Sequence, residues 1–156
     1  MTWTDKQEAG LMRNYKKIRT WQMADDLTVG IYELSAIFPK SEVYGLTSQL
    51  RRASYSVPAN IAEGAALDSK RHYLHFLYIA RGSLAETEYF VHLAQRLGYL
   101  SKEDQERMQE QINGVFSTLH GLITAVEQEN GTVARNLARF SSTIMLGLAL
   151  LPRLLS

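Results

Sequence analysis

The sequence contains no cysteine, which excludes disulfide bonds and any zinc site built from thiolate ligands. This composition suits a reducing compartment, so we expect a cytoplasmic protein. Proline is also scarce, with three residues in 156, and this scarcity favours helix. The first residues are polar and carry no apolar segment typical of a signal peptide. A chain of this length is expected to form one domain with its own core.

Acidic residues are absent from two parts of the chain, although the net charge is only +1. Residues 10–24 contain four basic residues and no acid, and residues 131–156 contain three arginines and no acid. Residues 101–130 instead contain six acidic and two basic residues. The chain as a whole is therefore not a basic nucleic-acid binder, and such a role would require a local basic surface.

Motifs for catalysis and for metal or cofactor binding are also absent. His72 and His75 have helical spacing, but no carboxylate stands at ligand spacing beside them and no HExxH motif occurs. There is no glycine-rich phosphate-binding loop, and no nucleophile stands on a strained turn. We expect no cofactor, no metal ion and no enzymatic activity.

Apolar residues recur every three or four positions in four segments, which is typical of amphipathic helices. The segments cover about residues 18–37, 45–64, 69–97 and 101–130, with short connections between them. The sequence therefore predicts an all-α, antiparallel up-down four-helix bundle over residues 18–130, after a flexible lead-in at residues 1–17. The expected core stripes are Ala24, Leu27, Ile31, Leu34 and Phe38; Leu50, Ala53, Val57 and Ile61; Tyr73, Leu77, Ala80, Leu84, Val91 and Ala94; and Met108, Ile112, Val115, Leu119, Leu122 and Val126.

Polar and small residues indicate where these helices begin and end. Gly98 and Gly131 are expected to end the third and fourth helices. Pro58 lies inside the second segment, where its missing N–H is expected to kink or split the helix. The expected helix N-caps are Ser41, Asp68 or Ser69, and Ser101.

The third segment has a second stripe of mixed apolar and polar residues, and a surface helix of a monomer needs only one apolar face. The segment is therefore expected to be central in the bundle or to contact another copy of the chain. Glu86 falls within this stripe, where a buried carboxylate requires a partner. We expect an interhelical network in which Arg51 or Arg52 pairs with Glu86 and Asn60 and Glu63 take part. The second stripe comprises Phe76, Ile79, Ser83, Glu86, Phe90, Leu93 and Leu97.

Two groups of basic residues are candidates for contacting nucleic acid. One group begins the first helix, and the other would gather if the second and third helices are antiparallel. A scattered, solvated surface is the alternative interpretation. The candidates are Lys16, Lys17, Arg19, Arg51, Lys70, Arg71 and Arg81.

The final segment, residues 131–156, is apolar and lacks acids. Its uncharged run, residues 140–151, is shorter than the roughly 20 residues that span a bilayer. We expect a fifth helix that docks on the bundle or on a neighbouring subunit, with contact with a membrane surface, disorder and a non-native extension as the alternatives.

Beyond this periodicity, the chain resembles a known family over about residues 18–127. The family is that of four-helix-bundle proteins encoded in intervening sequences of large-subunit ribosomal RNA genes, which also includes the accessory variability determinants of diversity-generating retroelements. The residues that carry the resemblance are Phe38-Pro39, Glu42, Tyr44-Gly45-Leu46, Gln49, Arg51-Arg52-Ala53, Ser56, Asn60-Ile61-Ala62-Glu63-Gly64, Ala80-Arg81-Gly82-Ser83, Glu86 and Leu97-Gly98-Tyr99.

This resemblance implies a homopentameric, barrel-like ring without enzymatic activity. For the retroelement branch it also implies binding of RNA or DNA through a basic surface and partnership with a reverse transcriptase. Both branches stay open. Residues 131–156 lie outside the family pattern.

Overall fold

The computed structural model describes residues 13–150, with side chains described through Gln128. Within this range the chain forms four α-helices and no strand, which confirms the predicted all-α class. The helices are α2 (Arg19–Leu34), α3 (Leu46–Ala65), α4 (Lys70–Arg96) and α5 (Lys102–Leu150). Three short 3-10 turns accompany them: η1 (Tyr15–Lys17), η2 (Ser35–Ile37) and η3 (Lys40–Glu42).

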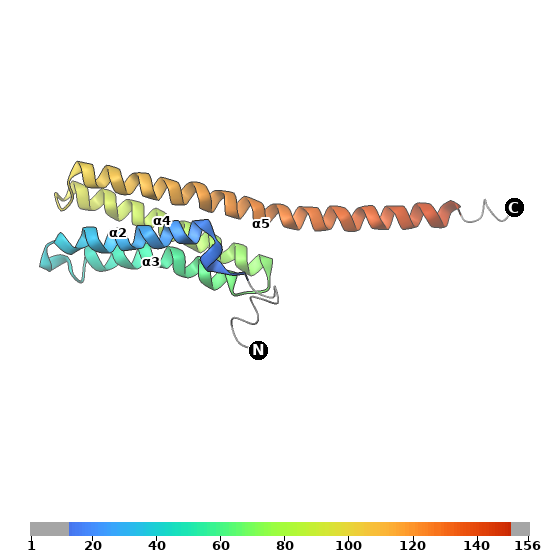
Figure 1. Cartoon of the computed structure of the whole chain (residues 1–156), viewed down its shortest axis with the longest axis horizontal. Helices are drawn as coiled ribbons and strands as arrows, with labels where there is room; N and C mark the ends of the chain where they lie inside the picture. The colour runs from blue at the N-terminus through green and yellow to red at the C-terminus, as the bar shows by residue number, and fades with distance from the viewer. Residues whose placement is uncertain (1–12, 151–156) are drawn as a thin grey trace. The chain divides into compact units, whose positions relative to one another are not determined.

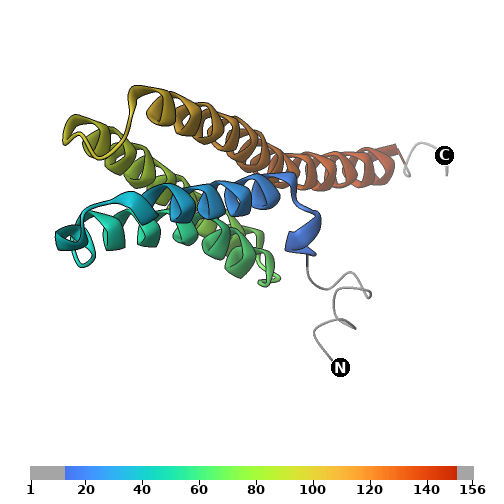
Figure 2. The same ribbon diagram turned by 60° about the vertical axis from the view of Figure 1, so that its left-hand side comes forward.

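The chain divides into two compact units, Met1–Ile123 and Thr124–Ser156. The first unit holds α2, α3, α4 and the beginning of α5, and successive helices in it run antiparallel (Figures 1 and 2). Polar contacts between helices agree with this direction. Arg52 of α3 contacts Glu86 of α4, whereas Ser56, further along α3, meets the earlier Ser83. Gln109 of α5 donates a hydrogen bond to Glu88 of α4 over 2.7 Å.

The predicted core stripes of α2, α3 and α4 are buried, and each helix turns one apolar face toward the others. In α5, Met108, Ile112, Val115 and Leu119 are buried as predicted. The stripe then continues with Ile123, whereas the predicted Leu122 is only half-buried. The buried stripe therefore steps four residues from Leu119 to Ile123, whereas the prediction assumed a step of three to Leu122. After the three-residue step from Ile112 to Val115, a pair of four-residue steps keeps the stripe closer to the 3.6-residue period of an α-helix.

The predicted end of α5 at Gly131 is wrong, because the helix continues to Leu150. A glycine inside a helix costs only about 1 kcal/mol relative to alanine, so it does not force the helix to end. The expectations for the lead-in before residue 13 and for the side chains of residues 131–156 fall outside the described residues. Among the described residues, no helix combines the length and hydropathy needed to cross a membrane.

The predicted end of α4 at Gly98 is confirmed. Gly98 has a φ of +77°, the left-handed conformation that glycine adopts without a steric penalty. Its N–H donates to the carbonyl of Gln95, and the N–H of Tyr99 donates to the carbonyl of Ala94. These two hydrogen bonds form a Schellman motif, which satisfies carbonyl groups left free at the helix end.

Two of the predicted N-caps are confirmed. The Ser101 hydroxyl accepts a hydrogen bond from the N–H of Asp104 over 3.0 Å at the start of α5. The Ser69 hydroxyl accepts from the N–H of His72 over 3.4 Å at the start of α4. In both cases a short polar side chain satisfies an N–H that has no partner within its helix.

The third predicted cap, Ser41, is wrong. Residues 40–42 form η3, so Ser41 stands before the first turn of α3 rather than at it. The Glu42 carboxylate takes the capping role, because its Oε2 accepts a hydrogen bond from the N–H of Leu46 over 2.9 Å. Its Oε1 accepts from the Tyr99 hydroxyl over 3.3 Å. Desolvation and, after it, the Glu42 charge raise the pKa of Tyr99.

Pro58 does not split α3, which continues from Leu46 to Ala65 with the proline buried inside it. Because proline has no N–H, the carbonyl of Ser54, four residues earlier, lacks its usual partner within the helix. The Thr28 hydroxyl of α2 lies 3.1 Å from this carbonyl and 2.8 Å from the carbonyl of Ala24, and it shares its proton between them. A neighbouring helix therefore supplies part of the hydrogen bonding that the proline removes.

Gly64 lies where α3 and α4 approach each other closely. A Cβ atom placed there would lie 2.8 Å from the Cβ of Phe76 and 2.9 Å from the Cδ2 of Tyr73. Both distances are shorter than side-chain packing allows. Only glycine therefore permits the two helices to meet as they do.

We predict that Gly64→Ala lowers the free energy of unfolding by about 1–3 kcal/mol, because the added methyl group forces α3 and α4 apart. Gly82→Ala is the matched control, since a Cβ at Gly82 in α4 meets no atom within 4 Å. It should raise stability by about 0.5–1 kcal/mol through improved helix propensity. Urea unfolding followed by circular dichroism measures both, and equal effects would contradict the proposed close approach.

Candidate nucleic-acid interface

Five of the seven residues predicted to contact nucleic acid lie at one end of the first unit. The turn η1 packs against the end of α3, where the N–H of Arg13 donates to the carbonyl of Ala65 over 3.2 Å. Helix α4 begins shortly after, so the start of α2 and the start of α4 share this end (Figure 1). We name this surface the basic end. It comprises Arg13, Lys16, Lys17, Arg19, Lys70 and Arg71.

Local structure holds part of the basic end in place. The Asn14 side chain accepts a hydrogen bond from the N–H of Lys16 over 3.1 Å, and the Gln22 side chain donates to the carbonyl of Lys16 over 2.8 Å. The Tyr15 and Trp21 rings meet edge to face with centroids 5.0 Å apart. Residues 13–17, the last part of the predicted lead-in, therefore belong to the bundle.

The side chains at this end are mainly open to solvent. Lys16, Lys17, Arg19 and Arg71 are exposed, whereas Lys70 is half-buried. Two exposed carboxylates, Glu63 and Asp68, lie near the same end and offset part of the positive charge. The arrangement can hold phosphate groups by charge.

Arg13 belongs to this surface although it was not predicted as a site residue. Its guanidinium carbon lies 4.5 Å from the centroid of the Tyr73 ring, a cation–π contact that orients the side chain over the start of α4. Its position in the basic run at residues 10–24 could have identified Arg13 as a candidate from the sequence. The contact with Tyr73 could not be predicted, because it depends on how α4 packs against the residues before α2.

Arg51 and Arg81 do not join the basic end, contrary to the expected gathering with Lys70 and Arg71. Because α3 and α4 are antiparallel, Arg52 stands level with Glu86, about 24 Å along α4 from Lys70. Arg81 is about 16 Å along the same helix from Lys70. Its guanidinium lies 4.7 Å from the centroid of the Tyr78 ring.

Arg51 instead completes the end of α2. Its Nε donates to the Ser35 hydroxyl over 2.7 Å, and its Nη2 donates to the carbonyl of Tyr32 over 3.3 Å. The guanidinium carbon also lies 4.7 Å from the centroid of the Tyr32 ring. A cation at a helix C-terminus is favourable because it faces free carbonyl groups and the negative end of the helix dipole.

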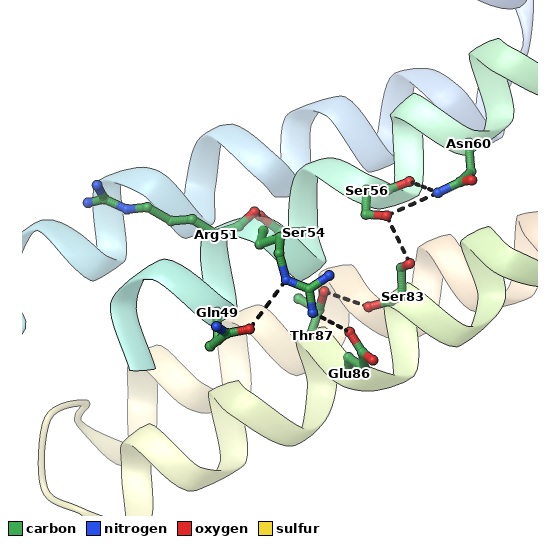
Figure 3. Close-up of polar contacts among 9 residues, drawn as sticks. Gln49, Arg51, Ser54, Ser56, Asn60, Ser83, Glu86 and Thr87 are labelled. Atoms are coloured by element: carbon green, nitrogen blue, oxygen red, sulfur yellow. Dashed lines mark hydrogen bonds and ion pairs between the residues drawn. The ribbon is translucent and has the colours of Figure 1, made fainter. Parts of the chain in front are cut away.

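Arg52 forms the ion pair with Glu86 across α3 and α4, with Nη2 and Oε2 3.5 Å apart. Figure 3 draws this pair as the dashed line that ends at Glu86. Its Nε also donates to the Gln49 side chain over 3.3 Å. The two side chains are 53% and 54% exposed, so the expectation of a buried carboxylate at Glu86 is wrong. The antiparallel packing places Glu86 at the rim of the α3–α4 contact, where water reaches it.

A second polar group lies deeper in the same contact and does not touch the ion pair. The Asn60 amide donates to the backbone carbonyl of Ser56 over 2.7 Å and to its hydroxyl over 3.0 Å. The Ser83 hydroxyl of α4 donates to the Ser56 hydroxyl over 3.1 Å (Figure 3). Glu63 is exposed and makes no hydrogen bond or ion pair with these residues.

The second stripe of α4 remains partly open to solvent in the single chain. Ile79 is 39% exposed and Leu97 is 50% exposed, whereas Phe76, Phe90 and Leu93 are half-buried. The stripe therefore leaves apolar surface available for contact with another molecule. Among the described residues, no group of three His, Asp or Glu side chains gathers as a metal site requires.

Comparison with known proteins gives a family and a fold. The model of the 23S rRNA-intervening sequence protein family matches residues 16–121. A similar solved structure is that of a protein with unknown function from the S23 ribosomal protein family of Bacteroides thetaiotaomicron VPI-5482. It is 24% identical with a TM-score of 0.63, and the match covers 67% of this chain and 95% of the other, so it shows the fold alone. No curated protein matches the sequence.

We predict that the two neighbouring arginines of α3 differ in their effect on stability. Arg51→Met should lower the free energy of unfolding by about 1–2 kcal/mol, because it removes two hydrogen bonds at the end of α2. Arg52→Met should cost less than about 1 kcal/mol, because the pair with Glu86 is half exposed and screened by water. Thermal and urea unfolding at low and high salt measure the difference, and a larger loss for Arg52→Met would contradict these roles.

Proposed function

The chain belongs to the 23S rRNA-intervening sequence protein family, and from this premise we propose that it is a non-catalytic homopentamer that binds nucleic acid without sequence specificity. We place the protein in the cytoplasm, in keeping with the absence of cysteine. Phosphate groups would be the part of the nucleic acid that it contacts.

The basic end is the observation that carries this proposal. It places cations from η1, the start of α2 and the start of α4 on one surface, although they are about 50 residues apart in the sequence. Lysine and arginine at such a surface neutralise phosphates and release counterions, which gives affinity that falls steeply with salt. Contacts to phosphate position a nucleic acid without reading its bases.

Self-association would strengthen the effect of a modest charge. The second stripe of α4 offers apolar surface for contact with another copy, and a closed ring repeats every surface patch with its symmetry. Five basic ends would then act on one strand together, which raises affinity through effective concentration. The ring and its five subunits are taken from the family resemblance.

A protein-binding scaffold is the second candidate function. The same apolar stripe supports it, since a partner such as a reverse transcriptase could occupy surface that the single chain leaves open. In this case the basic residues would have no direct contact with RNA or DNA.

We predict that Ile79→Glu reduces the assembly to smaller species, because it places a charge within the second stripe of α4. The matched control is Ala85→Glu, on the same helix and exposed but outside that stripe. Light scattering coupled to size-exclusion chromatography measures the mass of each. A wild-type monomer at micromolar concentration, or an Ile79→Glu variant of unchanged mass, would contradict the proposed use of this surface.

We predict that Lys16→Glu combined with Lys17→Glu weakens binding of single-stranded RNA at low salt by at least about tenfold. It should also reduce the slope of log affinity against log salt by roughly the number of lost phosphate contacts, about one for each lysine in each bound subunit. Fluorescence anisotropy with a labelled RNA of mixed sequence measures both quantities.

The matched control is Lys102→Glu combined with Arg107→Glu, which changes the net charge equally at the start of α5, the opposite end of the first unit. This control should lose much less affinity. Undetectable RNA and DNA binding by the wild-type protein at low salt would refute the function. Full retention of a protein partner by the Lys16 and Lys17 variant, without any nucleic-acid binding, would favour the scaffold.

A further inference from the structure

A cleft of about 380 Å³ lies where η2 and η3 connect α2 to α3, at the opposite end of these helices from the basic end. Lys40 and Arg51 both line it, and no carboxylate is among its lining residues. Its volume is within the range of small-molecule sites, which is roughly 300–1,000 Å³. The cleft thus offers two positive charges in a space that a small anion and an attached group can fill.

Arg51 presents a preorganised guanidinium to this cleft. Two of its N–H groups are held by the Ser35 hydroxyl and the carbonyl of Tyr32, and the Tyr32 ring packs against it. A guanidinium has five N–H donors in a rigid plane, so three remain for an anion. Because the side chain is already fixed, binding an anion costs little additional conformational entropy.

Thr47 supplies a polar group that the fold itself does not use. Its side chain lines the cleft and is only 7% exposed, and its hydroxyl finds no hydrogen-bond partner among the described residues. A buried polar group without a partner costs about 1–3 kcal/mol. The hydroxyl oxygen is itself covered from solvent, so a ligand oxygen in the cleft would become its partner after rotation about the Thr47 χ1 bond.

Two tyrosines complete the lining. Tyr32 and Tyr55 are 43% and 47% exposed, so parts of both side chains are open to a ligand in the cleft. Exposed aromatic faces beside fixed cations are the combination that binds a planar ring attached to a phosphate. Ser48 adds a further hydroxyl to the same lining.

We propose that this cleft binds a phosphate group carried by an aromatic base, as in a nucleotide. Lys40 and the free N–H groups of Arg51 contact the phosphate, the Thr47 hydroxyl joins them after rotation about its χ1 bond, and the base stacks on Tyr55. The ligand is a free nucleoside monophosphate or the terminal nucleotide of a strand, since both present the same chemistry. The site is separate from the basic end, so it does not depend on the function proposed above.

Isothermal titration calorimetry of the full chain with adenosine 5′-monophosphate at low salt, in a buffer without phosphate, tests the site. Lys40→Gln and Tyr55→Ala should each weaken binding by about tenfold, and adenosine without phosphate should bind more weakly by at least as much. Lys102→Gln, an exposed charge outside the cleft, is the matched control and should bind as the wild type does.

Thr47→Val gives the sharpest test, because it should lower nucleotide affinity without lowering the stability of the free protein. It should weaken nucleotide binding by about fivefold or more, because one hydrogen bond is lost. It should leave thermal stability of the free protein unchanged or raised, because it removes a buried hydroxyl without a partner. Lower stability together with unchanged nucleotide affinity would overturn the assignment of this hydroxyl to a ligand.

Strands with and without a terminal phosphate distinguish the two sources of the ligand. Stronger binding of a 5′-phosphorylated strand than of its 5′-hydroxyl counterpart, lost in Lys40→Gln, would assign the strand end, and equal binding of the two strands would assign the free nucleotide. The Lys16 and Lys17 variant should keep its affinity for adenosine 5′-monophosphate, which separates this site from the basic end. Absence of binding at millimolar nucleotide, or wild-type affinity in both Lys40→Gln and Tyr55→Ala, would refute the proposal.

Discussion

The close packing of α3 against α4 at Gly64 is the constraint on which the rest of the structure depends. The absence of a side chain there lets Tyr73 and Phe76 lie directly against the α3 backbone. This contact fixes how far the two antiparallel helices slide along each other. The start of α4 consequently lies beside η1, and the charges of Lys16 and Arg71 share one end of the bundle. The same register places Arg51 far from them.

The parts of the fold that the sequence could predict are those set by local pattern. Stripes such as Leu50 to Ile61 follow from helical periodicity, and a face of that width has to be buried. The end of α4 at Gly98 could be predicted for a similar reason, because glycine adopts without strain the left-handed conformation that often ends a helix. The cap at Ser101 depends on the residues directly after it. In each case the interacting groups are close in the sequence.

The parts that could not be predicted depend on contacts between distant residues. Arg51 and Arg52 are adjacent and identical in type, but they point to different helices. One completes the end of α2, and the other meets Glu86 at the rim of the α3–α4 contact. Which arginine takes which partner is decided by helix register. The cap at Glu42 was missed for a similar reason, because η3 moves Ser41 away from the first turn of α3.

Pro58 has a consequence for how the bundle acquires its structure. The carbonyl that this proline leaves without a partner in α3 accepts a hydrogen bond from Thr28 of α2. In an isolated peptide with the sequence of α3 only water can bond this carbonyl, and a protein donor reaches it only after α2 has docked. Helix α3 therefore reaches its final structure together with α2. Its helical stability depends on this packing more than on the helix propensity of its own residues.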